Sequence, residues 1–82
     1  MSLTPRQLEI LCLYAMGLKR PEIAVLLHLA PVTVDSHMEN IRARLGSRSI
    51  AHSIVVAVSR EMLVIDFVTE TVILPEQDLI AV

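Results

Sequence analysis

The chain has 82 residues, which is enough for one small domain around a single modest core. Although 54% of the residues are hydrophobic, there is only one Phe, one Tyr and no Trp, so aliphatic side chains must build that core, which favours packed helices. No apolar run approaches the ~20 residues of a membrane span, and the first residues lack a secretory pattern. We therefore expect a soluble cytoplasmic protein without a membrane partner. Cys12, the only cysteine, excludes a disulfide within the chain.

The charges are unevenly spread along the chain. The formal net charge of −2 would give little attraction to nucleic acid. However, residues 1–60 hold all seven Lys and Arg side chains against four acids, a balance of +3. Residues 61–82 hold five acids and no base, a balance of −5. The first sixty residues could therefore approach a polyanion, whereas the remainder would be repelled by it.

A first helix is predicted to begin at Pro5. Thr4 would be its N-cap, and Gln7 is placed to complete a capping box. Gly17 supplies the left-handed residue that ends the helix after Met16. The residues expected to face the core are Leu8, Leu11, Cys12 and Ala15.

Two further helices follow closely on one another. Pro21 begins a short helix that should stop near His28, and its inward residues would be Ile23, Ala24, Leu26 and Leu27. Pro31 begins a longer helix that runs to Gly46, with one buried stripe formed by Val34, Met38, Ile41 and Leu45. Only two or three residues separate these helices, which predicts the tight angle of a helix-turn-helix.

The last part of the chain changes character. Ser49 can cap a fourth helix that reaches roughly to Leu63, and residues 54–58 are apolar right around it, which predicts a second face that meets a partner. Residues 64–74 are rich in β-branched side chains and are interpreted as one strand, without an obvious partner in the chain; its alternate positions are Ile65, Phe67, Thr69, Thr71 and Ile73. Residues 75–78 resemble the acidic first turn of a short helix.

Residues 3–63 resemble the DNA-binding domains of LuxR/GerE type. The matching residues, in order and spacing, are Leu3-Thr4-Pro5-Arg6, Glu9-Ile10-Leu11, Gly17, Glu22-Ile23-Ala24, Thr33-Val34, His37, Asn40-Ile41 and Leu45-Gly46. The resemblance implies a mainly α, four-helix domain over residues 1–63. Residues 64–82 match nothing in the family pattern and are interpreted as an extension that serves dimerisation, since a lone strand leaves its backbone groups unpaired. The resemblance also implies a transcription regulator that binds double-stranded DNA specifically, with residues 31–45 as the recognition helix and RNA polymerase as a further candidate partner.

The resemblance also indicates which side chains would meet DNA. These residues are Lys19, Arg20, Pro31, Val32, Thr33, Asp35, Ser36, Glu39, Asn40 and Arg42. Phosphates would be met by the start of the third helix and also by Lys19, Arg20 and Arg42. Nucleobases would be met by Ser36 and Glu39. Asp35 has two interpretations: it accepts from a cytosine amino group, or it places negative charge near a helix N-terminus.

The sequence departs from the family pattern at several of these positions. Ala30 occupies the position before the third helix at which the family commonly has Ser. Ile50 occupies a position of the fourth helix at which the family commonly has Arg or Lys. Asp35, Ser36 and Glu39 occupy a surface where basic side chains are frequent in the family. Their presence weakens the non-specific attraction to DNA. Arg44 keeps a common positive charge, and we expect it to pair with Glu9 and join the first helix to the third.

A homodimer is expected through the fourth helix. Its apolar surface would otherwise face water, and the interface residues would be Ile54, Val55, Val56 and Ser59. The acidic recognition surface, the apolar fourth helix and the acidic tail also support an alternative function. In that alternative the chain is an interaction module, or an antagonist, that dimerises with a LuxR-type regulator and does not use DNA.

Catalysis and metal binding are not expected. His28, His37 and His52 lack metal-ligand spacing and have no companion cysteines, so no zinc site is predicted. The chain offers no nucleophile with a base, no paired carboxylates and no glycine-rich phosphate loop. We therefore expect neither an enzyme nor a cofactor.

Overall fold

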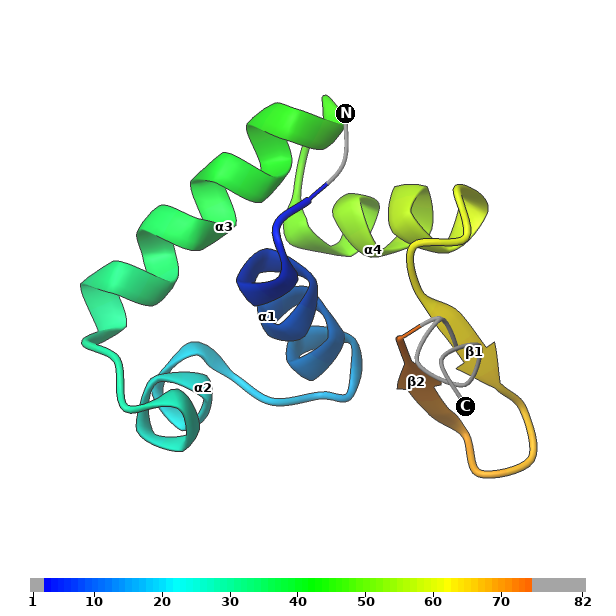
Figure 1. Cartoon of the computed structure of the whole chain (residues 1–82), viewed down its shortest axis with the longest axis horizontal. Helices are drawn as coiled ribbons and strands as arrows, with labels where there is room; N and C mark the ends of the chain where they lie inside the picture. Colours follow the sequence, from blue (N-terminus) through cyan, green and yellow to red (C-terminus); the bar gives the residue numbers. More distant parts are fainter. Residues whose placement is uncertain (1–2, 75–82) are drawn as a thin grey trace.

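The structure is a computed structural model that describes residues 3–74. Over these residues the chain forms helices followed by a small antiparallel hairpin (Figure 1). The elements are α1 (Pro5–Ala15), α2 (Arg20–Leu27), α3 (Pro31–Leu45), α4 (Ile50–Ser59), β1 (Val64–Asp66) and β2 (Thr71–Ile73). The expected mainly α, four-helix fold is confirmed. The short helix expected over residues 75–78 lies outside the described residues.

The first helix begins with the capping box that its sequence predicts. The Thr4 hydroxyl accepts from the Gln7 backbone N–H at 3.1 Å, and the Gln7 side chain accepts from the Thr4 backbone N–H at 2.9 Å. Two backbone donors that a helix start leaves unpaired are thereby satisfied. Gly17, at φ 97°, follows the C-cap residue Met16, as predicted. The buried face, however, includes Gln7 and Ile10 with Leu11, whereas Leu8 and Cys12 are only partly buried.

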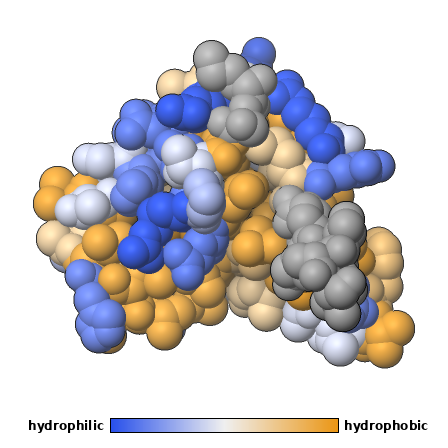
Figure 2. All heavy atoms as spheres, viewed as in Figure 1, coloured by the Kyte–Doolittle hydropathy of each residue, from blue (hydrophilic) through white to orange (hydrophobic). Residues whose placement is uncertain are grey.

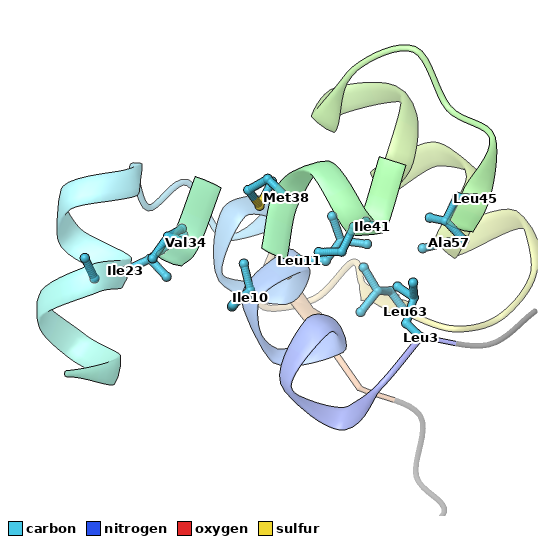
Figure 3. Close-up of a cluster of buried hydrophobic side chains, with 11 residues drawn as sticks. Leu3, Ile10, Leu11, Ile23, Val34, Met38, Ile41, Leu45, Ala57 and Leu63 are labelled. Carbon is cyan, nitrogen blue, oxygen red and sulfur yellow. The ribbon is translucent and has the colours of Figure 1, made fainter. Parts of the chain in front are cut away.

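The core lies where α1, α3 and α4 meet and continues between α2 and α3 (Figure 3). The predicted stripe on α3 is confirmed, because its four members are all buried: Val34, Met38, Ile41 and Leu45. On α2 only Ile23 and Ala24 are buried, and Leu26, which was expected to face inward, is 54% exposed. Two core residues come from outside the helices, Leu3 and Leu63.

The fourth helix ends earlier than its apolar sequence suggests. Ser49 caps its start, accepting from the His52 backbone N–H at 3.1 Å, but the helix stops at Ser59 instead of near Leu63. Glu61 adopts a left-handed conformation at φ 60°, and the Met62 backbone N–H returns to the carbonyl oxygen of Ala57 at 2.8 Å. This turn directs Leu63, only 1% exposed, back into the core. The end of the helix therefore coincides with the return of Leu63 to the core.

The expected single strand over residues 64–74 is wrong, because the segment folds back on itself. Val64 pairs with Ile73, Ile65 with Val72 and Asp66 with Thr71 in an antiparallel register. Phe67 and Thr69 therefore lie in the connecting turn and not on one face of a strand. The backbone N–H and C=O groups of this segment, for which the sequence offered no partner strand, are paired between its own two halves.

The hairpin packs on α1 through the two polar groups of Val72. The Cys12 thiol donates to the Val72 carbonyl oxygen at 3.2 Å, and the Val72 backbone N–H donates to the sulfur of Met16 at 3.1 Å. Partial burial raises the pKa of the Cys12 thiol, which keeps it protonated as a donor. Cys12 thus has a packing role, as its sequence context indicated.

Candidate nucleic-acid interface

Helices α2 and α3 are joined by the three residues 28–30. His28 ends α2 in a left-handed conformation at φ 58°, and the Leu29 backbone N–H donates to the carbonyl oxygen of Ala24 at 2.8 Å. Across this turn Ile23 of α2 and Val34 of α3 point toward one another (Figure 3). The short connection and this contact hold the two helices in the expected helix-turn-helix arrangement.

The face of α3 opposite its buried stripe is open to solvent. It lies along the outer edge of the molecule in Figure 1. Val32 is 68% exposed, and three of the candidate DNA-binding residues are fully on this surface: Ser36, Glu39 and Asn40. Thr33, Asp35 and Arg42 flank it and are partly buried. The candidate residues of α3 therefore form one continuous surface along the helix.

An ion pair joins the starts of α2 and α3. Arg20 Nη1 lies 2.9 Å from Asp35 Oδ2, and both side chains are about half exposed. The pKa of the nearby Tyr14 hydroxyl is raised, first by burial and then by the negative charge of Asp35, while Arg20 opposes the shift. This pair was not predicted, because the two residues are 15 positions apart and meet only through the angle between the helices.

A second ion pair lies farther along α3. Arg42 Nη1 is 3.0 Å from Glu39 Oε2, one helical turn before it. Arg42 Nη2 also donates to the carbonyl oxygen of Arg48 at 3.3 Å, whereas its buried Nε has no partner among the described residues. Arg42 is thus held to the protein at two points, and Arg20 keeps more of its donors available for an external anion.

The starts of α2 and α3 complete this surface. Lys19 precedes α2, and its backbone N–H donates to the Glu22 carboxylate at 2.7 Å, while its side chain is exposed. Ala30 occupies the N-cap position of α3 and provides no side-chain hydrogen bond there. Pro31 and Val32 follow it at the surface. The positive end of the α3 dipole is therefore presented without a capping oxygen, an arrangement that favours an anion.

Glu9 does not pair with Arg44 as expected. Its Oε1 lies 3.1 Å from Nη1 of Arg6, on the same helix, so the pair does not join α1 to α3. Sequence spacing alone could have indicated this, because residues three apart on a helix are neighbours. Both side chains are nearly half exposed, which makes the pair a surface feature of small energetic weight.

The candidate dimer residues of α4 differ in exposure. Val55 is 60% exposed and Ser59 also faces solvent, whereas Ile54 and Val56 are partly buried and pack against the core. The outer face of α2 is also apolar: in Figure 2 hydrophobic atoms gather over the region that α2 occupies in Figure 1. That face carries Val25, which is 77% exposed.

Residues 3–74 contain neither a candidate metal site nor a helix that could span a membrane. Within this range no three His, Cys, Asp or Glu side chains come together in a way that could hold a metal ion. None of the helices described here has the length and apolarity needed to cross a membrane.

Comparison with known proteins supports this interpretation of the fold. Residues 1–57 match GerE, the luxR family of bacterial regulatory proteins. The chain is similar to a solved structure of VqmA bound to DPO, with 30% identity and a TM-score of 0.67 over 73% of this chain and 30% of that one. It is also similar to a complex of VqmA from Vibrio cholera with ligand and DNA, with 30% identity and a TM-score of 0.68 over 73% of this chain and 26% of that one.

The matches cover different shares of this chain and of the proteins compared with it. The chain spans less than a third of the length of either VqmA chain. No curated protein sequence matches it significantly. The family match, however, covers well over half of the chain and includes the first three helices and most of α4. The chain therefore belongs to the luxR family of bacterial regulatory proteins.

Proposed function

We propose that the chain binds double-stranded DNA with sequence preference as a transcription regulator, with α3 in the major groove. The observation that carries this proposal is the pairing of a fully buried stripe on α3 with an exposed polar face opposite it, held against α2 by a three-residue turn. A helix supported in this way fits the width of the major groove. The similarity to a VqmA structure that contains DNA supports the same function.

The contacts divide into two groups in this proposal. Phosphates would meet the start of α3 at residues 31–33, together with Lys19 and Arg20 on one side and Asn40 and Arg42 on the other. Base edges would meet the exposed side chains between them, which are Asp35, Ser36 and Glu39. Phosphate contacts position the helix, and base contacts provide sequence preference.

The proposed role also defines where the chain acts and with what. A bacterial regulator of this kind works in the cytoplasm, where the DNA lies, and RNA polymerase would be its partner in regulation. The described surface is not strongly basic, because Asp35 and Glu39 each neutralise an arginine. We therefore expect weak non-specific binding and a correspondingly large share of the affinity from base contacts.

The test is binding of the full 82-residue chain to labelled genomic fragments, measured by fluorescence anisotropy from low to moderate salt. Arg20→Ala should lower the slope of log affinity against log salt by about 0.9 for each phosphate that the variant no longer neutralises, whatever the sequence of the duplex. Arg6→Ala is the matched control, because Arg6 forms a similar half-exposed pair on α1, away from α3. An Arg20→Ala variant with the slope of the wild type would contradict this docking.

A second function is favoured by the outer face of α2. A shallow apolar depression of about 470 Å³ is lined by Leu18, Pro21, Glu22, Val25 and Leu26. Such a surface, next to a recognition face that carries two acids, would suit an interaction module or an antagonist that pairs with another luxR-family regulator. If no duplex is bound even at low salt, this function replaces the first.

A further inference from the structure

Two acids lie on the exposed face of α3, and each is paired with an arginine. Asp35 and Glu39 lie four residues apart, on one side of the helix, and their side chains are 48% and 73% exposed. Each carboxylate accepts from an arginine at its outer side, Arg20 at 2.9 Å and Arg42 at 3.0 Å. The centre of the proposed recognition surface is therefore acidic, and its two margins are basic.

This arrangement makes the carboxylates available to a ligand. Asp35 lies beyond the first turn of α3, and its carboxylate is turned to Arg20 and not to a backbone N–H at the start of the helix. Each acid accepts a hydrogen bond from one arginine, whereas two carboxylate oxygens offer about four acceptor positions. Because the side chains of Asp35 and Glu39 are 48% and 73% exposed, both acids can accept further hydrogen bonds from a ligand. The arginines restrict the motion of the acids and offset their charge, so a neighbouring polyanion is tolerated.

The chemistry of a carboxylate determines what it can recognise in the major groove. An ionised carboxylate accepts hydrogen bonds and cannot donate. Cytosine and adenine present amino groups there, at N4 and N6, whereas guanine and thymine present acceptor oxygens at the corresponding places. A carboxylate held against a base edge therefore favours the first two bases and is repelled by the last two.

We propose that Asp35 and Glu39 determine the base preference of this protein, that both select amino-group donors in the major groove, and that Arg20 and Arg42 are their positioning residues. This proposal rests on the proposed DNA-binding function. Four residues of helix rise by about 6 Å, and base pairs are stacked about 3.4 Å apart, so the two preferences should fall about two base pairs from one another. Each half-site would then contain two such positions, both with cytosine or adenine on the strand that meets the acids.

The test is selection from a random duplex library with the full chain, followed by affinity measurements on single-base variants of the selected duplex. The wild type should prefer cytosine or adenine over guanine or thymine by about 5- to 150-fold at each of the two positions. Asp35→Ala should remove the preference at one position only, and Glu39→Ala at the other. Glu39→Gln should shift the preference toward adenine, because an amide can bind N6 and N7 of adenine together.

Two further variants separate recognition from structure. Arg42→Gln should reduce the preference at the Glu39 position and leave that at the Asp35 position unchanged, a result that a general loss of folding would not produce. Glu9→Gln, which removes the acid of an ion pair on α1, should leave both preferences intact. Selected sites with guanine or thymine at these positions, or preferences that survive both alanine variants, would overturn the inference. Absence of any bound duplex would instead overturn the proposed function itself.

Discussion

Asp66 stabilises the turn of the hairpin through its side chain. Asp66 is the last residue of β1. Its Oδ1 accepts hydrogen bonds from the backbone N–H groups of Val68 at 2.9 Å and Thr69 at 3.2 Å. The hydrogen bond from Thr69 and then that from Val68 lower the pKa of the Asp66 carboxyl below its ordinary value. The ionised form therefore stabilises the turn, and protonation weakens it.

We expect the turn to depend on pH in the acid range. Because the folded-state pKa of Asp66 lies below the unfolded value of about 4, its stabilising contribution is complete above that pH and is lost as the pH falls through the lowered folded pKa. Asp66→Ala should remove the contribution at all pH values. The measurement is the amide chemical shift and hydrogen exchange of Val68 and Thr69 at pH 7 and pH 2. Wild type and variant should differ at pH 7, and the difference should be smaller at pH 2. Identical amides at pH 7 would contradict the role of Asp66.

Local residue patterns could be predicted, and contacts between helices could not. The capping box of Thr4 and Gln7 depends only on residues three apart, and it is present as expected. The Arg20 and Asp35 pair depends on how α2 crosses α3, which no single segment encodes. The turn at Asp66 left a usable signal, an aspartate two residues before the amide it binds, but the run of β-branched residues around it suggested a continuous strand.

At the level of elements, α3 followed its apolar spacing, whereas α1 and α2 bury partly different residues from those expected and α4 ends earlier. The stripe of α3 is buried as the period of 3.6 residues predicts. The apolar run 54–58 obscured the end of α4, which lies at Ser59, before the left-handed Glu61 and the buried Leu63. Within this run the sequence did not show that Ile54 and Val56 pack against the core whereas Val55 is exposed.

The exposure of individual α4 residues indicates which substitutions test the predicted homodimer interface. Val55→Glu should dissociate the dimer without lowering thermal stability of the monomer, because Val55 is 60% exposed. Val56 packs against the core, so Val56→Glu should lower the melting temperature as well. The measurements are sedimentation equilibrium and a thermal melt for each variant. A wild type that remains monomeric at high micromolar concentration, or a Val55→Glu variant that still dimerises, would contradict the interface.

At the scale of the whole molecule, a dimer through α4 implies symmetry in the DNA. Two copies of α3 related by a two-fold axis should enter successive major grooves, so the operator should contain inverted half-sites about one helical turn apart. Footprinting on selected sites measures this spacing. Inserting about five base pairs between the half-sites moves them to opposite sides of the duplex and should abolish cooperative binding. Equal affinity for the original and the expanded site would show that each chain binds alone.

The contact between Val72 and the first helix has a consequence for the order of folding. Cys12 and Val72 are joined by a hydrogen bond although they are 60 positions apart in the sequence. This contact therefore closes a loop that contains most of the described chain. Closing so long a loop costs entropy and is slow compared with helix packing among nearer neighbours. The helices contact one another over shorter separations in the sequence, so we expect them to pack before this contact closes. The hairpin therefore docks last, onto a side of α1 that is already in place.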